Sequence, residues 1–229
     1  MDIASVQLGW ILFAGTHIGL GSYRIRKALI DKLGERMFQG VYSLVALATF
    51  AFLCFAYAKS TDETPFIVWG KDSRVMLYLC DFTMLLGFIV FFCGFFNPTP
   101  LGMKPVRFDA FGVTRITRHP QNMGFALFGL SHLFTNRLAV DWIFFGGFVL
   151  FGYLGSMHQD RRKVREIGSE LEDFVSQTSI TPFWAILTRV QRLNFGELSK
   201  IGLVLGIAAT VIARILHPSI LERLLNVSL

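Results

Sequence analysis

All five histidines stand in or beside long apolar segments, and four of them are the residues of this chain best suited to chemistry. His17 and His132 are flanked by apolar residues, whereas His119 and His158 lie where apolar segments meet charged ones. A neutral imidazole surrounded by hydrocarbon needs a hydrogen-bond partner, a metal or a haem iron. The pattern therefore favours His17 and His132 as ligands of a bound group, while the other two are also tolerated at an interface without a ligand.

A few other polar residues fall within the same apolar segments. Asp81 and Arg214 are predicted to pair with each other, or Arg214 extends to the membrane surface. His217 lies at the end of the last apolar segment and is interpreted as structural. The depth of each of these residues in the membrane, calculated at about 1.5 Å of rise per residue of helix, defines two levels. One level holds His17, His119 and His158, and the opposite level holds Asp81, His132 and Arg214.

Apolar segments long enough to cross a bilayer must hold these side chains. About 20 apolar residues cross the ~30 Å hydrocarbon core. Of the 229 residues, 53% are hydrophobic and 17% are charged, and soluble domains normally hold about 25% charged residues. The sequence predicts an all-α, polytopic transmembrane bundle of about six spans in one domain, residues 1–229. The predicted spans are residues 3–23, 41–58, 75–96, 121–136, 140–157 and 200–217.

Basic residues are unevenly distributed among the connections. The first, third and fifth connections hold fifteen Lys and Arg, and the other connections and tails hold five. Because basic residues near span ends are retained in the cytoplasm, both termini are predicted on the periplasmic side. In the last cytoplasmic connection, about residues 159–199, apolar residues recur at helical spacing. This predicts amphipathic helices that lie on the inner interface or pack against the spans.

Charge and cysteine content exclude several classes of protein. The net charge of +6 comes from basic residues beside the spans, so we expect the lipid bilayer and not nucleic acid as partner. Cys54, Cys80 and Cys93 are odd in number and form no CxxC pair, which excludes a disulfide framework and a CxxC metal site. The first apolar segment follows Asp2 and exceeds a signal-peptide core, so it is expected to remain as a span.

Three short motifs together resemble one known family. They are Gly15-Thr16-His17, Thr117-Arg118-His119-Pro120, and Ser131-His132-Leu133-Phe134-Thr135-Asn136 followed by Phe144-Phe145-Gly146-Gly147-Phe148. The likeness is to the NnrU family and runs over most of the chain. It implies a bacterial inner-membrane protein associated with denitrification and nitric-oxide metabolism. The family is similar to the plant 15-cis-zeta-carotene isomerase, which implies haem b with histidine ligands and isomerase-like or redox chemistry on an apolar substrate.

This resemblance makes His17 and His132 the implied haem ligands, with His119 and His158 as alternates, and it assigns no catalytic residue. Two imidazoles on one iron must each lie within roughly 2 Å of it. The predicted topology separates His17 from His132 by roughly 10 Å along the membrane normal. A pairing of His17 with His119 or His158 is therefore an alternative.

Three polar residues are expected around the liganded histidines: Asp81, Arg118 and Asn136. Asp81 is predicted to orient His132 by accepting a hydrogen bond. Glycines near His17 and in the fourth and fifth spans leave room for a flat ligand, although close packing of helices explains them equally well. An apolar small molecule is therefore a possible partner, and the oligomeric state is left open.

A second resemblance, to isoprenylcysteine carboxyl methyltransferases, rests on Arg118-His119-Pro120 before a span and an amphipathic segment after it. It implies S-adenosylmethionine as an alternative cofactor, in a pocket around Arg118, His119 and residues 158–181. Asn122 stands where that family has tyrosine, and Asp160-Arg161-Arg162 replaces its acidic pair. A shared architecture does not by itself carry a shared cofactor. The third hypothesis is a non-catalytic assembly or regulatory factor.

Overall fold

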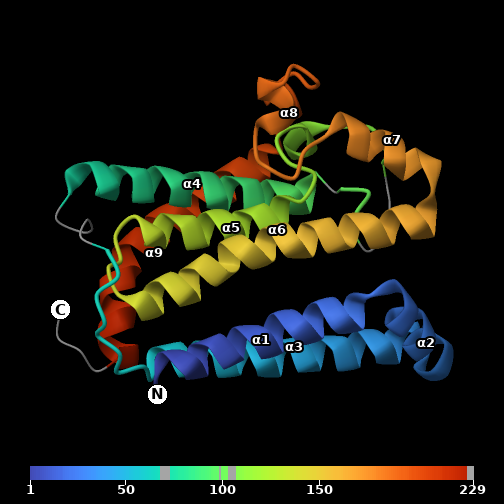
Figure 1. Cartoon of the computed structure of the whole chain (residues 1–229). Helices are drawn as coiled ribbons and strands as arrows, with labels where there is room; N and C mark the ends of the chain where they lie inside the picture. Colours follow the sequence, from blue (N-terminus) through green and yellow to red (C-terminus); the bar gives the residue numbers. More distant parts are fainter. Residues whose placement is uncertain (68–72, 98, 103–106, 226–229) are drawn as a thin grey trace.

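The computed structural model describes residues 1–67, 73–97, 99–102 and 107–225, with only the backbone described for residues 218–225. Within these residues the fold is a bundle of α-helices, with two short 3-10 helices and one isolated bridge between Pro65 and Leu138 (Figure 1). The elements in chain order are α1 (Ile3–Gly21), α2 (Tyr23–Leu33), α3 (Glu35–Ala58), α4 (Arg74–Phe96), η1 (Gly112–Arg115), α5 (Pro120–Leu133), α6 (Ala139–Ile167), α7 (Ser169–Gln177), α8 (Trp184–Leu187), η2 (Phe195–Glu197) and α9 (Lys200–Leu225).

Five helices of the described chain are long and apolar enough to cross a membrane, namely α1, α3, α4, α6 and α9. They coincide with five of the predicted spans, so the prediction of a polytopic helical membrane protein is confirmed. The predicted fourth span corresponds to α5, which has 14 residues and is therefore only ~21 Å long. This helix alone is too short for the ~30 Å hydrocarbon core.

The helix that the sequence analysis did not predict is α2, which follows α1 directly. Ser22 has an extended backbone (φ −68°, ψ 143°), so it ends α1 and begins α2. α2 carries Arg24, Arg26 and Lys27 and buries none of its residues. Its basic and apolar faces are typical of a helix on a membrane surface.

Helix packing divides the bundle into two groups (Figure 1). α4, α5 and α6 pack in sequence with α9 on α4, and the pair α1 and α3 joins this group through contacts of α1 with α6. α3 has no contact of comparable extent with α4 in the described residues, although the two are consecutive spans. The close approach of α5 and α6 requires Gly129, because a Cβ atom there would collide with the Phe145 carbonyl oxygen.

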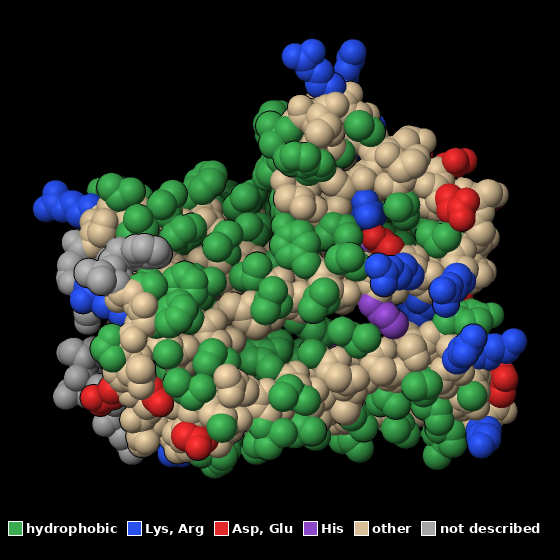
Figure 2. Space-filling model, viewed as in Figure 1, with side chains coloured by type: hydrophobic (Ala, Val, Ile, Leu, Met, Phe, Trp, Pro, Cys, Tyr) green, Lys and Arg blue, Asp and Glu red, His purple; other side chains and the backbone are tan. Residues whose placement is uncertain are grey.

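The connection after α6 has a packed part and an exposed part. Leu171 and Phe174 of α7 are buried against Leu101. The first amphipathic segment therefore packs against the ends of the spans, which was one of the two alternatives from the sequence. Farther along, Leu187 and Phe195 are 72% and 75% exposed, and the region around α8 protrudes at the top of the molecule (Figure 2).

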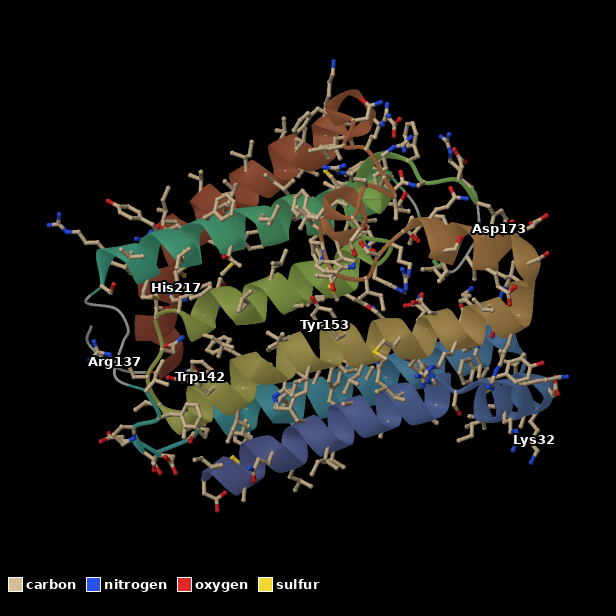
Figure 3. All side chains as sticks on the ribbon, turned by 45° about the horizontal axis from the view of Figure 1, so that its top comes forward. Lys32, Arg137, Trp142, Tyr153, Asp173 and His217 are labelled. Atoms are coloured by element: carbon tan, nitrogen blue, oxygen red, sulfur yellow. The ribbon has the colours of Figure 1, made fainter. Side chains whose placement is uncertain are left out.

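The two ends of the bundle differ in composition. We call them the α2 end, which also holds α7 and the start of α5, and the N-terminal end, where α1 begins and α9 ends. Lys32 and Asp173 lie at the α2 end, and Arg137, Trp142 and His217 lie at the N-terminal end (Figure 3). Charged side chains gather beside α2 and α7, while hydrophobic side chains cover the middle of the bundle (Figure 2). This distribution fits a bilayer around the middle of the bundle.

Candidate functional site

Arg118 and His119 meet Asp160 of α6 at the α2 end of the bundle. Arg118 donates from Nε and Nη2 to Asp160 Oδ2 at 3.0 and 2.8 Å, and from Nη1 to the Thr178 carbonyl oxygen at 2.7 Å. His119 Nε2 lies 2.7 Å from Asp160 Oδ1. We call these three side chains the latch, because they join the start of α5 to α6 and to the segment after α7.

The polar groups of the latch form hydrogen bonds with one another and with the backbone of the protein. Burial lowers the pKa of His119 below its ordinary value of 6.5, against the opposing effect of Asp160. The imidazole is therefore neutral at pH 7 and donates its Nε2 proton to the carboxylate. Arg118 and His119 are 9% and 3% exposed, and neither lines the three cavities described below. Both side chains are therefore held by contacts within the protein.

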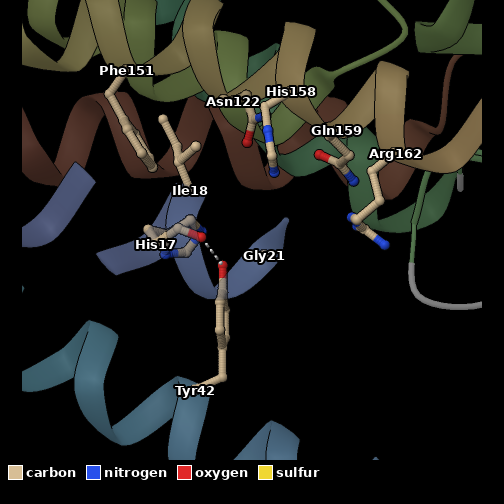
Figure 4. Close-up of a pocket in the computed structure, with 10 residues that line it drawn as sticks. His17, Ile18, Gly21, Tyr42, Asn122, Phe151, His158, Gln159 and Arg162 are labelled. Atoms are coloured by element: carbon tan, nitrogen blue, oxygen red, sulfur yellow. Dashed lines mark hydrogen bonds between the residues drawn. The ribbon is translucent and has the colours of Figure 1, made fainter. Parts of the chain in front are cut away.

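The first cavity, which we call the His17 cavity, lies between α1, α3, α5 and α6 near the α2 end (Figure 4). Its volume is about 170 Å³, and its lining includes His17, Tyr42, His158 and Arg162. The Tyr42 hydroxyl donates to the His17 carbonyl oxygen at 3.3 Å. His17 Nδ1 and His158 Nε2 are buried and have no hydrogen-bond partner within the described chain. The predicted cluster of three histidines thus reduces to two, because His119 belongs to the latch.

The second cavity, the His132 chamber, lies at the N-terminal end and has a volume of about 730 Å³. His132 Nδ1 lies 2.9 Å from the Phe128 carbonyl oxygen, which can only accept, so Nδ1 carries the proton and Nε2 has a free lone pair. The ring stacks on Phe145, with centroids 4.1 Å apart. The His217 ring also lines the chamber, with its centroid 6.1 Å from that of His132.

Other polar residues singled out in the sequence also line the chamber. Asp81 pairs with Arg214 at 3.7 Å, which confirms that predicted pair. The acceptor that orients His132 is the Phe128 carbonyl, a role predicted for Asp81. Asn136 donates from Nδ2 to the His132 carbonyl oxygen at 2.9 Å. Arg118, the third expected neighbour, lies in the latch instead.

The third cavity is an aromatic cleft between α3, α4, α5 and α6, with a volume of about 340 Å³. Its lining is apolar throughout: Phe50, Cys54, Met84, Gly87, Phe88, Phe91, Gly124, Phe125, Phe128, Phe144 and Phe148. Met84 also lines the His132 chamber, and the Phe128 ring lies 4.5 Å from the His132 ring. The cleft and the chamber are therefore adjacent.

The two implied haem ligands, His17 and His132, lie in different cavities. The His17 ring contacts Phe151, whereas the His132 ring contacts Phe145. Phe145 and Phe151 are six residues apart on α6, which corresponds to ~9 Å along the helix. This value agrees with the separation of His17 and His132 predicted from the topology. The structure brings together His17 with His158, and His132 with His217.

Sequence reasoning missed the partners of these histidines. His217 was interpreted as a residue of a helix end, and Tyr42 and Asp160 were not connected with any histidine. A weak signal was present, because Asp160 is an acidic residue just beyond an apolar segment and needs a buried partner if the helix continues. The aromatic cleft had no signal beyond the abundance of phenylalanine.

Together these features define an α-helical integral membrane protein with imidazole-lined cavities at both ends of its bundle and an apolar cleft beside one of them. The family model described as "NnrU protein" matches residues 6–223, and the chain belongs to the NnrU family. The predicted family resemblance is thereby confirmed.

Two curated relatives are similar over most of this chain. The chloroplastic 15-cis-zeta-carotene isomerase of Zea mays is 26% identical over 187 residues, which cover 80% of this chain and 50% of the relative. The enzyme of the same name from Arabidopsis thaliana is 27% identical over 220 residues, covering 91% of this chain and 58% of the relative. The chain thus spans about half the length of the curated relatives it matches. No solved structure matches this chain.

Proposed function

We propose that this protein is an isomerase-like membrane protein that acts on an elongated apolar substrate, with haem b held in the His132 chamber. The observation that carries the proposal is the state of His132. Its Nδ1 proton is fixed on the Phe128 carbonyl oxygen at 2.9 Å, which leaves Nε2 as a ligand nitrogen. The same ring lies directly beside an apolar cleft.

The residues of the chamber suit a haem. Its volume of about 730 Å³ falls within the ~300–1,000 Å³ of pockets that hold cofactor-sized ligands. His217 offers a second imidazole, and Lys59 lines the chamber as a cation for a propionate group, whereas Arg214 is paired with Asp81. When bound, the haem supplies a redox-active iron whose ligation sets its reactivity.

The aromatic cleft suits an unsaturated hydrocarbon chain. Seven phenylalanines line it, and aromatic faces pack well against a flat conjugated chain. The cleft lies between α3 and α4, which lack an extensive mutual contact in the described residues. A substrate dissolved in the bilayer would therefore enter sideways without crossing water. The relatives are named for the isomerisation of 15-cis-zeta-carotene, which makes this polyene the natural test substrate.

We further place the α2 end in the cytoplasm and the His132 chamber on the periplasmic side of a bacterial inner membrane. The basic residues of α2 and of the end of α6 support this orientation, because basic residues near span ends are retained in the cytoplasm.

The experiment is to express the protein with ample haem and to purify it in detergent. Reduced-minus-oxidised spectra then test for bound haem, and an assay on 15-cis-zeta-carotene tests for isomerisation. We expect a Soret band and conversion of the polyene, both lost in His132→Ala. Cys54→Phe should narrow the cleft, keep the Soret band and reduce conversion at least tenfold. A matched control on the same helix, Leu47→Phe, is 66% exposed and lies outside the linings of the cleft and of the chamber, so it should retain conversion.

Wild-type protein without a Soret band would refute the haem proposal. A band that survives in His132→Ala but not in His17→Ala would move the haem to the His17 cavity. Full biological function after all five histidines are replaced would favour the non-catalytic factor.

A further inference from the structure

The His17 cavity is not used by the proposed function, and it contains two polar atoms that need a partner. His17 Nδ1 and His158 Nε2 are buried without a hydrogen bond within the described residues. Buried polar atoms are nearly always paired, so each such exception calls for an explanation. Two of them on facing helices of one cavity indicate a ligand with two polar positions.

The size and composition of the cavity limit what this ligand can be. A volume of about 170 Å³ lies below the ~300 Å³ at which cofactor-sized pockets begin, so a porphyrin does not fit. A water molecule takes up only about 30 Å³. No group of three or more His, Cys, Asp or Glu side chains suited to a metal occurs in the described chain. The cavity therefore fits one small ring better than a haem or a bare metal ion.

The walls suit a flat ring. The Phe151 ring lies edge-on to the His17 ring with centroids 5.3 Å apart, and the Tyr42 ring is tilted against the same imidazole with centroids 4.9 Å apart. Gly155 keeps space open, because a Cβ atom there would meet only Phe151, at 3.9 Å. The aromatic and glycine positions thus leave a slot whose polar lining includes the two imidazoles together with Asn122, Gln159 and Arg162.

The slot lies where a lipid-soluble ring would be found. On α6 the sequence changes from apolar to charged directly after His158, at Asp160-Arg161-Arg162. This change marks the level at which the helix leaves the hydrocarbon. A ring bound here keeps its polar groups near the interface, while an attached apolar tail extends into the bilayer.

We infer that the His17 cavity binds the head group of a membrane quinone or quinol. Such a ring carries two oxygen atoms on opposite edges, which matches two separate imidazoles with unpaired nitrogens. An imidazole nitrogen donates to a quinone carbonyl oxygen when it carries the proton, and accepts from a quinol hydroxyl when it does not. The inference concerns this cavity alone and does not require a haem in the His132 chamber.

The test is calorimetric titration of the purified full-length protein with decylubiquinone and decylubiquinol in detergent. Gly155→Leu fills the slot and should weaken binding at least tenfold. Its matched control is Gly146→Leu on the same helix, where a Cβ atom meets nothing within 4 Å, and its affinity should equal that of wild type. His17→Gln and His158→Gln should weaken binding about tenfold, whereas His217→Gln should not.

Equal affinity of Gly155→Leu and Gly146→Leu would overturn the inference. So would binding of Zn²⁺ in place of the quinone, or loss of a Soret band in His158→Gln, which would assign the cavity to a metal or to the haem. A protein that lacks haem but binds decylubiquinone through His17 and His158 would refute the proposed haem and leave this inference standing.

Discussion

The α2 end and the N-terminal end of the bundle are held together by different interactions. At the α2 end, charged side chains join segments far apart in the sequence: Arg118 with Asp160 at 2.8 Å, and Arg115 with Glu197 at 2.7 Å. At the N-terminal end the contacts are mainly between rings, such as Tyr57 stacked on Phe144 with centroids 4.0 Å apart. The ion pair Asp81–Arg214 at this end is longer, at 3.7 Å, and largely exposed.

The difference agrees with the positions of the two imidazole-lined cavities, of which the larger, the His132 chamber, lies at the N-terminal end. Charge-assisted hydrogen bonds have strict geometry and fix the segments they join, and the smaller His17 cavity lies at this end. Aromatic contacts tolerate several arrangements, which allows a wide chamber and a cleft to coexist with a packed bundle. The rigid end thus suits a ligand of fixed size, and the aromatic end suits a large or variable one.

Loss of the latch should have the largest effect on stability. Asp160→Ala leaves the buried Arg118 charge without its partner, which costs about 3–5 kcal/mol. Thermal unfolding in detergent measures this loss. The control at the opposite end, Asp81→Ala, removes an exposed ion pair and should cost at most about 1 kcal/mol. Equal losses in the two variants would contradict the contrast between the ends.

A smaller effect is expected where α5 meets α6 beside the chamber. Gly129→Ala places a Cβ atom against the Phe145 carbonyl oxygen, and overpacking of this kind costs about 1–3 kcal/mol. Because the shift moves Phe145 and His132, haem content should fall while decylubiquinone binding at the His17 cavity is retained. Gly146→Ala, which meets no atom within 4 Å, is the control. Loss of both ligands in Gly129→Ala would show that the two ends are not independent.

The smallest effect concerns pH and the Arg115–Glu197 pair at the α2 end. Hydrogen bonds from Arg115 lower the pKa of Glu197 from its ordinary value of 4.5 to about 2. A lowered carboxyl pKa stabilises the folded state above the unfolded pKa, and this contribution is lost as the pH falls through the folded pKa. Glu197→Gln should therefore cost up to about 1 kcal/mol at pH 7, a value limited by screening from water.

The difference between wild type and Glu197→Gln should fade between pH 4.5 and about 2. Melting temperatures of both proteins across this range provide the measurement. A difference that persists unchanged at pH 2, or one already absent at pH 7, would show that the pair contributes in another way.

The sequence predicted the spans well because each is a long apolar run, a signal that needs no tertiary information. It also predicted the Asp81–Arg214 pair, since depth along straight helices follows from residue number. It failed at α2, where the backbone changes direction at Ser22, directly after Gly21, and separates two helices without a proline. It also could not find the pairing of His132 with His217 or of Asp160 with His119, because these depend on how helices rotate about their axes.

We expect the short length of α5 to give the His132 chamber access to both water and lipid. Since ~21 Å of helix leaves part of the membrane thickness uncrossed, we expect the turn after α5 to lie below the surface of the hydrocarbon. Its backbone finds partners in the segment before α4: Ala139 donates to the Thr64 carbonyl at 2.9 Å, and Phe66 donates to the Arg137 carbonyl at 2.8 Å. We therefore expect a local depression of the bilayer at this turn. Small polar molecules would then reach His132 from the aqueous phase, while the neighbouring cleft would open to lipid.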